Sequence, residues 1–288
     1  MTTKIHFDAC HHQKQAFQGK WIVVEGPDRI GKTTLIRNLQ SRISAHGINV
    51  MTNGFPRRKT PIGTLLDQTL KSRDTVKDWK AQTLLFLSDM LEAQEEIKSW
   101  RALENGNGTV ITDRYVASTY AYAKAQRHEF HTSKDEEWLN KVITLLPQPD
   151  AYVILIPEDN DICFLTQRSN FGCEVTERED IQQQVVKNYL DILTKLREEL
   201  SSQNSNPKVI EVVVGKDNTP ETICDGIVMP GLMRALSSYN DEQQTRYTAD
   251  PYTEVLFNEL VVPRLTAEYE RNPRVRTVDK AATMPTII

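Results

Sequence analysis

The fold of this chain is decided by the stretch Gly26-Pro27-Asp28-Arg29-Ile30-Gly31-Lys32-Thr33. It matches the pattern G-x-x-x-x-G-K-[ST] at every fixed position, which is typical of a loop whose backbone N–H groups surround a polyphosphate. The apolar run 21–24 predicts a buried strand before the loop, and apolar side chains at helical spacing over 34–43 predict a helix after it. So short a pattern can match by chance, but the strand and the helix on either side favour nucleotide binding.

The polar residues of this loop have distinct expected tasks. Lys32 supplies a point charge for the outer phosphates, and the Thr33 hydroxyl is suited to Mg²⁺. We therefore expect ATP as a ligand, its phosphates contacting Gly26, Gly31, Lys32, Thr33 and Thr34.

Composition argues against several other functions. The chain has 288 residues and a net charge of −4, so its overall charge does not favour binding to nucleic acid or to an anionic membrane. No apolar run approaches the length of a membrane span, and residues 1–10 lack the features of a signal peptide. The four cysteines form no C-x-x-C pair, so we interpret them as reduced thiols of a cytoplasmic protein, the nucleus being the other reducing compartment.

From residue 20 onward, short apolar runs alternate with longer helical stretches. This alternation predicts an α/β fold: a parallel five-stranded sheet with helices on both faces. The strands are expected near 20–25, 48–52, 109–112, 151–156 and 208–214. The helices are expected near 32–46, 61–72, 77–101, 115–126, 135–145, 178–202 and 219–238.

The two ends of the chain differ from this central part. Residues 1–18 are polar and irregular, so we expect a leader before a nucleotide-binding domain at 19–240. Residues 241–288 form a C-terminal extension, in which apolar side chains over 251–268 recur at near-helical spacing, interrupted by Pro263. We interpret the extension as a helix that packs on the domain, followed by a tail; docking of a partner is the alternative.

Charged side chains follow the second and third predicted strands at the points where those strands end. Arg57 and Arg58 follow the second strand, and Asp113 and Arg114 follow the third. In an open parallel sheet the carboxyl ends of the strands line the ligand crevice, so these groups should share a rim with the phosphate loop. An arginine fork can grip a phosphate with two hydrogen bonds, and a carboxylate there can orient Mg²⁺ or its water.

Structural roles are open for the same residues. Arg57 is interpreted as a solvated loop residue, and an aspartate at a strand-to-helix junction, such as Asp113, is common for capping alone. Their joint occurrence at two successive strand ends favours a site for an acceptor phosphate. The region 52–58 contains arginines and no acid, which favours a nucleoside monophosphate over a neutral hydroxyl as the acceptor.

In this set of motifs the chain resembles the thymidylate kinases, most of all the eukaryotic and viral type, over roughly residues 19–238. The matching motifs are Asp28-Arg29, Phe55 to Arg58, Thr60 to Gly63, Leu84-Leu85-Phe86, Asp113 to Tyr115 with Ser118, and Arg168 before Phe171-Gly172. The resemblance implies a P-loop kinase fold and a transferase that phosphorylates dTMP to dTDP with ATP and Mg²⁺. A homodimer is implied by analogy.

The resemblance also implies a task for each matched position on the donor side. Lys32 would bridge the donor phosphates, and Arg29 and Arg168 would stabilise charge on the phosphoryl group in transfer. Thr33 and Asp113 would serve the metal.

The acceptor nucleotide would occupy the other matched positions. Arg58 and Arg114 would grip its phosphate, and Phe86 would stack on its base, although an aromatic on the apolar face of a long helix also fits a core position. The implied substrate-binding set is Asp28, Phe55, Arg58, Phe86, Met90, Arg114, Ser118 and Tyr122.

The chain departs from the family pattern at two places. Met90 stands where the family has an arginine that contacts the base edge, and a thioether offers no hydrogen-bond donor. Val175-Thr176 stand where the family lid has Arg-Tyr, with Arg178 as a possible substitute. Two alternatives therefore stay open: a monophosphate kinase of different or broader base specificity, and a regulatory nucleotide-binding protein with a degenerate site.

Overall fold

A computed structural model of the chain describes residues 16–72, 76–103, 107–126, 132–166, 174, 176–200, 208–237 and 258–259. The strands are β1 Trp21–Glu25, β2 Asn49–Gly54, β3 Gly108–Asp113, β4 Ala151–Pro157, β5 Lys208–Val214 and β6 Asn258–Glu259. The main helices are α2 Lys32–Ser44, α3 Pro61–Lys71, α4 Trp79–Glu92, α5 Gln94–Arg101, α7 Val116–Ala125, α8 Ser133–Ile143, α10 Glu179–Leu200 and α12 Met229–Leu236. Shorter segments are η1 Glu158–Asn160, α9 Cys163–Thr166, α11 Pro220–Ile223 and the π-helical turn η2 Cys224–Val228.

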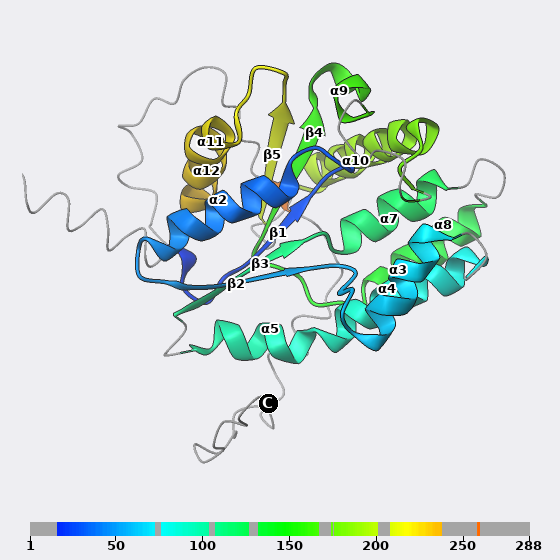
Figure 1. Cartoon of the computed structure of the whole chain (residues 1–288), viewed down its shortest axis with the longest axis horizontal. Helices are drawn as coiled ribbons and strands as arrows, with labels where there is room; N and C mark the ends of the chain where they lie inside the picture. The colour runs from blue at the N-terminus through cyan, green and yellow to red at the C-terminus, as the bar shows by residue number, and fades with distance from the viewer. Residues whose placement is uncertain are drawn as a thin grey trace, which may run out of the picture.

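The strands form one sheet in the order β2-β3-β1-β4-β5-β6, in which β1 to β5 are parallel. This confirms the predicted five-stranded parallel sheet. The strand order changes direction at β1: β3 pairs with it on one side, and β4 pairs with it on the other. Such a switch point opens a crevice at the carboxyl ends of the strands, where the phosphate loop lies (Figure 1).

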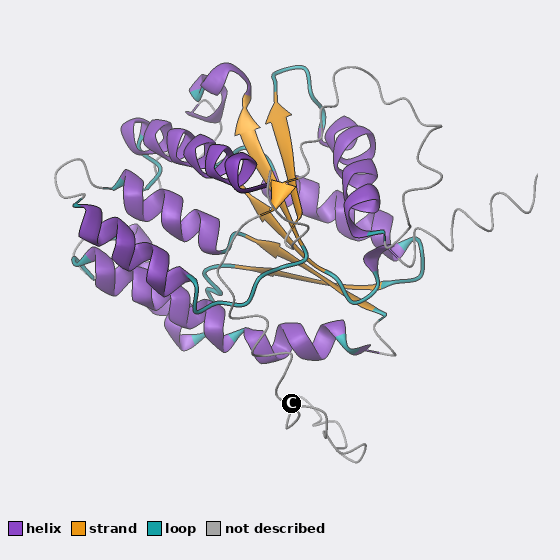
Figure 2. Cartoon of the chain, turned by 180° about the vertical axis from the view of Figure 1, so that it is seen from behind, coloured by secondary structure: helices purple, strands orange, loops and turns teal. Residues whose placement is uncertain are grey.

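Helices cover both faces of the sheet, as expected (Figures 1 and 2). Alternate residues of β1 point to opposite sides: Ile22 and Val24 pack with α2 and α12, whereas Trp21 and Val23 pack with α5, α7 and α10. All four side chains are at most 1% exposed, so β1 is the centre of two hydrophobic layers. The strand that carries the phosphate loop is therefore buried on both of its faces.

Two expected helices are interrupted. The helix predicted over 77–101 divides at Ala93, where the side-chain amide of Gln94 donates to the carbonyl of Met90 at 2.8 Å. The helix predicted over 219–238 includes the π-helical turn η2 before Pro230. Proline lacks an N–H and its ring needs space beside the preceding turn, which the wider turn provides.

The ends of the domain also differ from expectation. Ala16 and Phe17 are buried in the core, so the packed part of the chain includes residues that we assigned to the leader. In the extension, Asn258 and Glu259 pair as an antiparallel strand with Val209 and Lys208, in a stretch for which the sequence predicts a helix. The remainder of that stretch, and residues 1–15, lie outside the described residues.

Candidate active site

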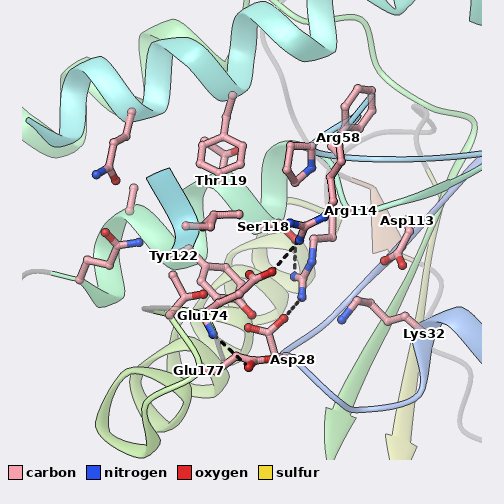
Figure 3. Close-up of a pocket in the computed structure, with 18 of the residues that line it drawn as sticks. Asp28, Lys32, Arg58, Asp113, Arg114, Ser118, Thr119, Tyr122, Glu174 and Glu177 are labelled. Atoms are coloured by element: carbon pink, nitrogen blue, oxygen red, sulfur yellow. Dashed lines mark hydrogen bonds and ion pairs between the residues drawn. The ribbon is translucent and has the colours of Figure 1, made fainter. Parts of the chain in front are cut away.

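A cavity of about 500 Å³ lies at the carboxyl ends of β1, β2 and β3. Its walls come from the phosphate loop, the loop after β2, the start of α7, the helix α4 and the segment before α10 (Figure 3). The predicted residues that line it are Asp28, Arg29, Gly31, Lys32, Thr33, Thr34, Phe55, Arg58, Phe86, Met90, Asp113, Arg114, Ser118 and Tyr122. The structure thus brings together residues that are far apart in the sequence.

The backbone of the phosphate loop requires its glycines. Gly26 has φ 141°, and a Cβ on it would lie 2.5 Å from the carbonyl oxygen of Leu155. Gly31 has φ 109° and is the residue before α2, so the first N–H groups of that helix are open to an anion. The local sequence therefore builds the phosphate site that the motif predicts.

Lys32 is folded back onto this loop. Its Nζ donates to the carbonyls of Pro27 at 2.6 Å and Gly26 at 3.1 Å, and the residue is only 6% exposed. Burial, with the charge of Arg114, lowers the pKa of Lys32 to about 8, while Asp113 and other nearby carboxylates oppose the shift. A polyanion bound in the loop would favour the charged amine.

Arg114 lies at the centre of the cavity (Figure 3). Its guanidinium is ion-paired with Asp28, donates to Ser118 Oγ at 3.1 Å and lies 5.1 Å from the centre of the Tyr122 ring. Burial alone would raise the pKa of Asp28, but the charges of Arg114 and Lys32 lower it overall. Arg114 is thus a cation held inside the cavity by several contacts, with its side chain 19% exposed.

Two arginines of the site have left-handed backbone conformations. Arg29 has φ 65° and Arg114 has φ 69°. Non-glycine residues adopt this region at a cost, and such residues concentrate at functional sites. The backbone strain at both positions supports a role that depends on where these side chains point.

The start of α7 is capped by Glu25 and not by Asp113. Glu25 Oε1 accepts from the backbone N–H groups of Tyr115 at 2.7 Å and Ser118 at 3.2 Å, and α7 has no side-chain cap at its N-cap residue, Tyr115. Asp113 is thereby left free for another task. Its Oδ1 is buried and has no hydrogen-bond partner within the described part of the chain.

The chemistry of the donors fits Mg²⁺. Thr33 and Asp113 both line the cavity, and Asp113 has a carboxylate oxygen without a partner. Among the described residues, no cluster of three or more His, Cys, Asp or Glu side chains is placed to bind a metal. Mg²⁺ usually has one or two protein ligands and completes its shell with water and substrate phosphates, so a site of this composition suits it.

Acidic residues before α10 contact two of the predicted arginines. Arg58 is half-exposed, is ion-paired with Asp67 and lies 2.7 Å from Glu174. Arg29 lies 2.7 Å from Glu177. Both arginines line the cavity, and each guanidinium is held there by a carboxylate.

Arg57 differs from the expectation of a solvated loop residue. Its side chain is 13% exposed and lies 3.0 Å from Asp89, whose side chain is fully buried, and 2.5 Å from Glu92. The loop after β2 is anchored to α4 through this pair, and Thr60 caps α3 beside it by accepting from Gly63 N at 3.1 Å. Arg57 therefore holds the loop that presents its neighbour Arg58.

The end of the cavity away from the phosphate loop is uncharged. Phe86 lines it and is partly buried, whereas the ring of Tyr122 lies nearer the charged groups, 5.1 Å from the Arg114 guanidinium. Met90 lines it with 1% exposure, and Phe55 with 5%. The remaining lining at this end among the described residues is also neutral: Leu70, Trp79, Gln82, Thr83, Thr119, Ala123 and Gln126.

Sequence reasoning missed several residues of the site. Thr119 lines the cavity, and its buried hydroxyl has no partner. It follows Ser118 and lies one turn before Tyr122 on α7, so helical spacing could have identified it. Gln182 of α10 is fully buried and donates to Asp28 Oδ2 at 2.8 Å, a contact that no local pattern signals.

Part of the predicted lid is outside the described residues. This holds for Arg168, for Phe171-Gly172 and for Val175. Arg178, the possible substitute for a lid arginine, is exposed and paired with Asp180 at 2.6 Å.

Fold and site together define the class of protein: a P-loop nucleotide kinase, with a phosphate loop and arginines at one end of a cavity and a neutral, partly aromatic end opposite. A family model, Thymidylate kinase, matches residues 24–215, and the chain belongs to the thymidylate kinase family. This family membership makes it a nucleoside monophosphate kinase.

Known members of the family are similar over most of the domain. The thymidylate kinase of Dictyostelium discoideum is 31% identical over 173 residues, which are 60% of this chain and 72% of that protein. A homologue from Invertebrate iridescent virus 6 is 32% identical over 181 residues, 61% of this chain and 79% of its own length. The structure of the thymidylate kinase of Candida albicans, an enzyme of broad substrate specificity, has a TM-score of 0.58 and 27% identity, covering 72% of this chain and 88% of its own.

Proposed function

We propose that this protein transfers the terminal phosphoryl group of ATP to dTMP, giving dTDP and ADP. The observation that carries the proposal is the placement of Lys32, Arg58 and Arg114 on one cavity whose opposite end is neutral and includes Phe86. One nucleotide phosphate is expected at the loop, and a second at the two arginines. Family membership supports the same reaction.

The protein contributes position and positive charge. Phosphoryl transfer proceeds with charge spread over the oxygens of the transferred group, so catalysis depends mainly on orientation and electrostatic stabilisation. Lys32 and the N–H groups at the start of α2 hold the donor phosphates, while Arg114 and Arg58 hold the acceptor phosphate in line with them. Arg29 is suited to stabilise the group in transfer, and Arg168 is proposed for the same role from the family resemblance.

Mg²⁺, when bound, would neutralise charge on the donor phosphates. We propose Thr33 and Asp113 as its protein contacts, since the Asp113 Oδ1 atom lacks another partner. An acceptor phosphate is already nucleophilic, so the site needs no strong base at the end of β2, where the chain has arginines.

The acceptor base is expected at the neutral end of the cavity, against Phe86. Phe86 is proposed to stack on it, with Tyr122 beside the deoxyribose and Asp28 near the sugar and phosphate. The segment before α10 would close over the donor and exclude water.

The direct test is an ADP-release assay across deoxynucleoside and ribonucleoside monophosphates with ATP and Mg²⁺. Transfer to dTMP with the highest kcat/KM supports the proposal. ATP binding without transfer to any monophosphate would refute it and indicate a regulatory protein with a degenerate site. A higher kcat/KM for another monophosphate would replace dTMP as the proposed substrate.

Two further expectations are kept as proposals. A homodimer is proposed by analogy with the family, and sedimentation of the full chain tests it. The cytoplasm is proposed as the compartment. Within the described part of the chain, no helix is both long and apolar enough to cross a membrane.

A further inference from the structure

Glu25, the last residue of β1, is a buried carboxylate beside the cavity that it does not line. It is 0% exposed, and four donors contact its two oxygens: Tyr115 N at 2.7 Å, Ser118 N at 3.2 Å, Tyr189 Oη at 2.9 Å and the Ser118 hydroxyl. A carboxylate only accepts hydrogen bonds, so it satisfies all four donors at once. The mechanism proposed above gives this group no task.

The hydroxyl of Ser118 connects Glu25 to Arg114. A hydroxyl has one hydrogen, and in this arrangement Ser118 donates it to Glu25 Oε2. The lone pairs of Ser118 Oγ are then directed elsewhere, and Arg114 donates to that oxygen from 3.1 Å. Tyr189 Oη lies 2.8 Å from the same Ser118 oxygen and also donates to Glu25 Oε2. The carboxylate therefore accepts the hydrogens of both hydroxyls, which leaves Ser118 Oγ as an acceptor for Arg114.

The same carboxylate fixes the backbone from which Arg114 extends. Its Oε1 holds the N–H groups of Tyr115 and Ser118, which are the first turn of α7. Tyr115 directly follows Arg114, whose backbone is in the left-handed region with φ 69°. Glu25 thus acts on Arg114 from two sides: it holds the adjoining backbone and it orients a side-chain acceptor of the guanidinium.

We infer that Glu25 is a positioning residue for the acceptor phosphate: acting through Ser118 and the start of α7, it holds the Arg114 guanidinium in the direction that receives this phosphate. The inference rests on the proposed function, because it assigns Arg114 to the acceptor. Asp28 contacts the same guanidinium from the cavity side, where a phosphate would compete with it. Glu25 itself does not line the cavity and is fully buried, so its hold on Ser118 and on the start of α7 persists when the substrate binds.

The first test is Glu25→Gln, which keeps the size and one accepting oxygen but turns the other position into a donor. At least one of the two hydroxyls must then reverse its bond, so Ser118 loses the fixed direction of its lone pairs. We expect KM for dTMP to rise roughly 10-fold, the effect typical of losing one hydrogen bond to a charged group. KM for ATP should change less than about 3-fold, because Arg114 serves the acceptor.

The second variant, Ser118→Ala, removes the connecting hydroxyl and leaves both backbone N–H bonds to Glu25. It should raise KM for dTMP to a similar extent, and the double variant should be no worse than the worse single variant, since both act through one contact. Tyr152→Phe is the control: its buried hydroxyl has no partner, so both KM values should match those of the unaltered protein. If Glu25→Gln does not fold, Glu25→Asp replaces it: the shorter side chain keeps the charge but withdraws the carboxylate from Ser118, so KM for dTMP should rise while KM for ATP stays nearly unchanged.

All variants are compared by melting temperature, by steady-state kinetics and by calorimetric titration with dTMP, which needs no turnover. A selective loss of dTMP affinity supports the inference. Equal losses for ATP and dTMP, a lower melting temperature with unchanged constants, or multiplied effects in the double variant would overturn it. An unaltered protein that binds dTMP but transfers no phosphate would refute the proposed function, while the titration still tests the role of Glu25.

Discussion

The guanidinium of Arg58 lies 2.7 Å from the carboxylate of Glu174, at the place where an acceptor phosphate is expected. Arg29 is held by Glu177 at the same distance, 2.7 Å. Both carboxylates come from the segment before α10, so in the absence of substrate this segment supplies the negative charge that phosphates would supply later. When a phosphate binds, it takes the place of the carboxylate. Each arginine therefore has a negatively charged partner both before and after binding.

Glu174→Gln is expected to tighten binding of the acceptor. Arg58 is half-exposed, so the pair contributes little, and exposed pairs typically contribute ~0.2–1 kcal/mol. Removing the competing charge should therefore lower KM for dTMP by about 1.5- to 5-fold. Glu137→Gln, which removes an exposed carboxylate on α8, is the control and should leave KM unchanged. A higher KM for dTMP would mean that Glu174 assists the acceptor.

Arg57 and Arg58 are neighbours whose substitutions should differ in their cost to stability. Arg57→Ala leaves the fully buried Asp89 without its ion-pair partner, which should lower the free energy of unfolding by about 3 kcal/mol. Arg58→Ala should cost less than about 0.5 kcal/mol, because its side chain is half-exposed, yet it should raise KM for dTMP. Urea unfolding of both variants measures the contrast. Equal free energies of unfolding for the two variants would show that Arg57 does not anchor the loop after β2.

Lys32 should impose a pH limit on the free enzyme. Because burial and the charge of Arg114 lower its pKa to about 8, the amine loses its proton, and with it the charge that binds ATP, as pH rises through that value. The kcat/KM for ATP should therefore fall above pH 8, whereas kcat should fall at higher pH because bound phosphates favour the charged amine. Lys32→Ala should reduce kcat by roughly 10²-fold or more, and the decrease of kcat/KM for ATP above pH 8 should disappear. A Lys32→Ala protein with normal turnover would defeat the assignment.

Asp113→Asn is expected to weaken the response to Mg²⁺. The variant keeps the shape of the side chain but removes the charge of one of the two metal contacts that we propose. The Mg²⁺ concentration for half-maximal rate should rise roughly 10-fold, in line with changes to groups that support a metal site. Removing Mg²⁺ with a chelator should stop transfer in the unaltered protein, and adding it back should restore the rate. An unchanged Mg²⁺ requirement in Asp113→Asn would place the metal elsewhere.

The sequence predicts the parallel sheet and the placement of Lys32, Asp113 and Arg114 because each depends on a local rule. A phosphate loop needs a strand and a helix around it, and the ends of parallel strands meet at one edge. Gln182 and Glu25 could not be found in this way. Their roles depend on contacts between elements that meet only in the folded protein, and the contacting residues are 90 or more positions apart in the sequence. No periodic pattern within one element indicates such a contact. The interpretation of Arg57 failed for the same reason, since Asp89 is its partner only after α4 packs on the loop.

Met90→Arg tests what reads the acceptor base. Met90 is 1% exposed and lines the neutral end of the cavity, where the family resemblance implies an arginine. A guanidinium there can donate to the 4-oxo group of thymine or uracil but only repels the 4-amino group of cytosine, whereas a thioether does neither. The ratio of kcat/KM for dTMP over dCMP should therefore rise, by about 10-fold or more for one hydrogen bond to a charged group. Met90→Leu conserves the volume without adding a donor, so its ratio should match that of the unaltered protein.

A dTMP over dCMP ratio that does not change in Met90→Arg, in a protein that still folds and turns over dTMP, would show that this side chain does not face the base. The hydroxyl of Thr119, which also lines the cavity and is buried without a partner among the described residues, would then be the next group to vary.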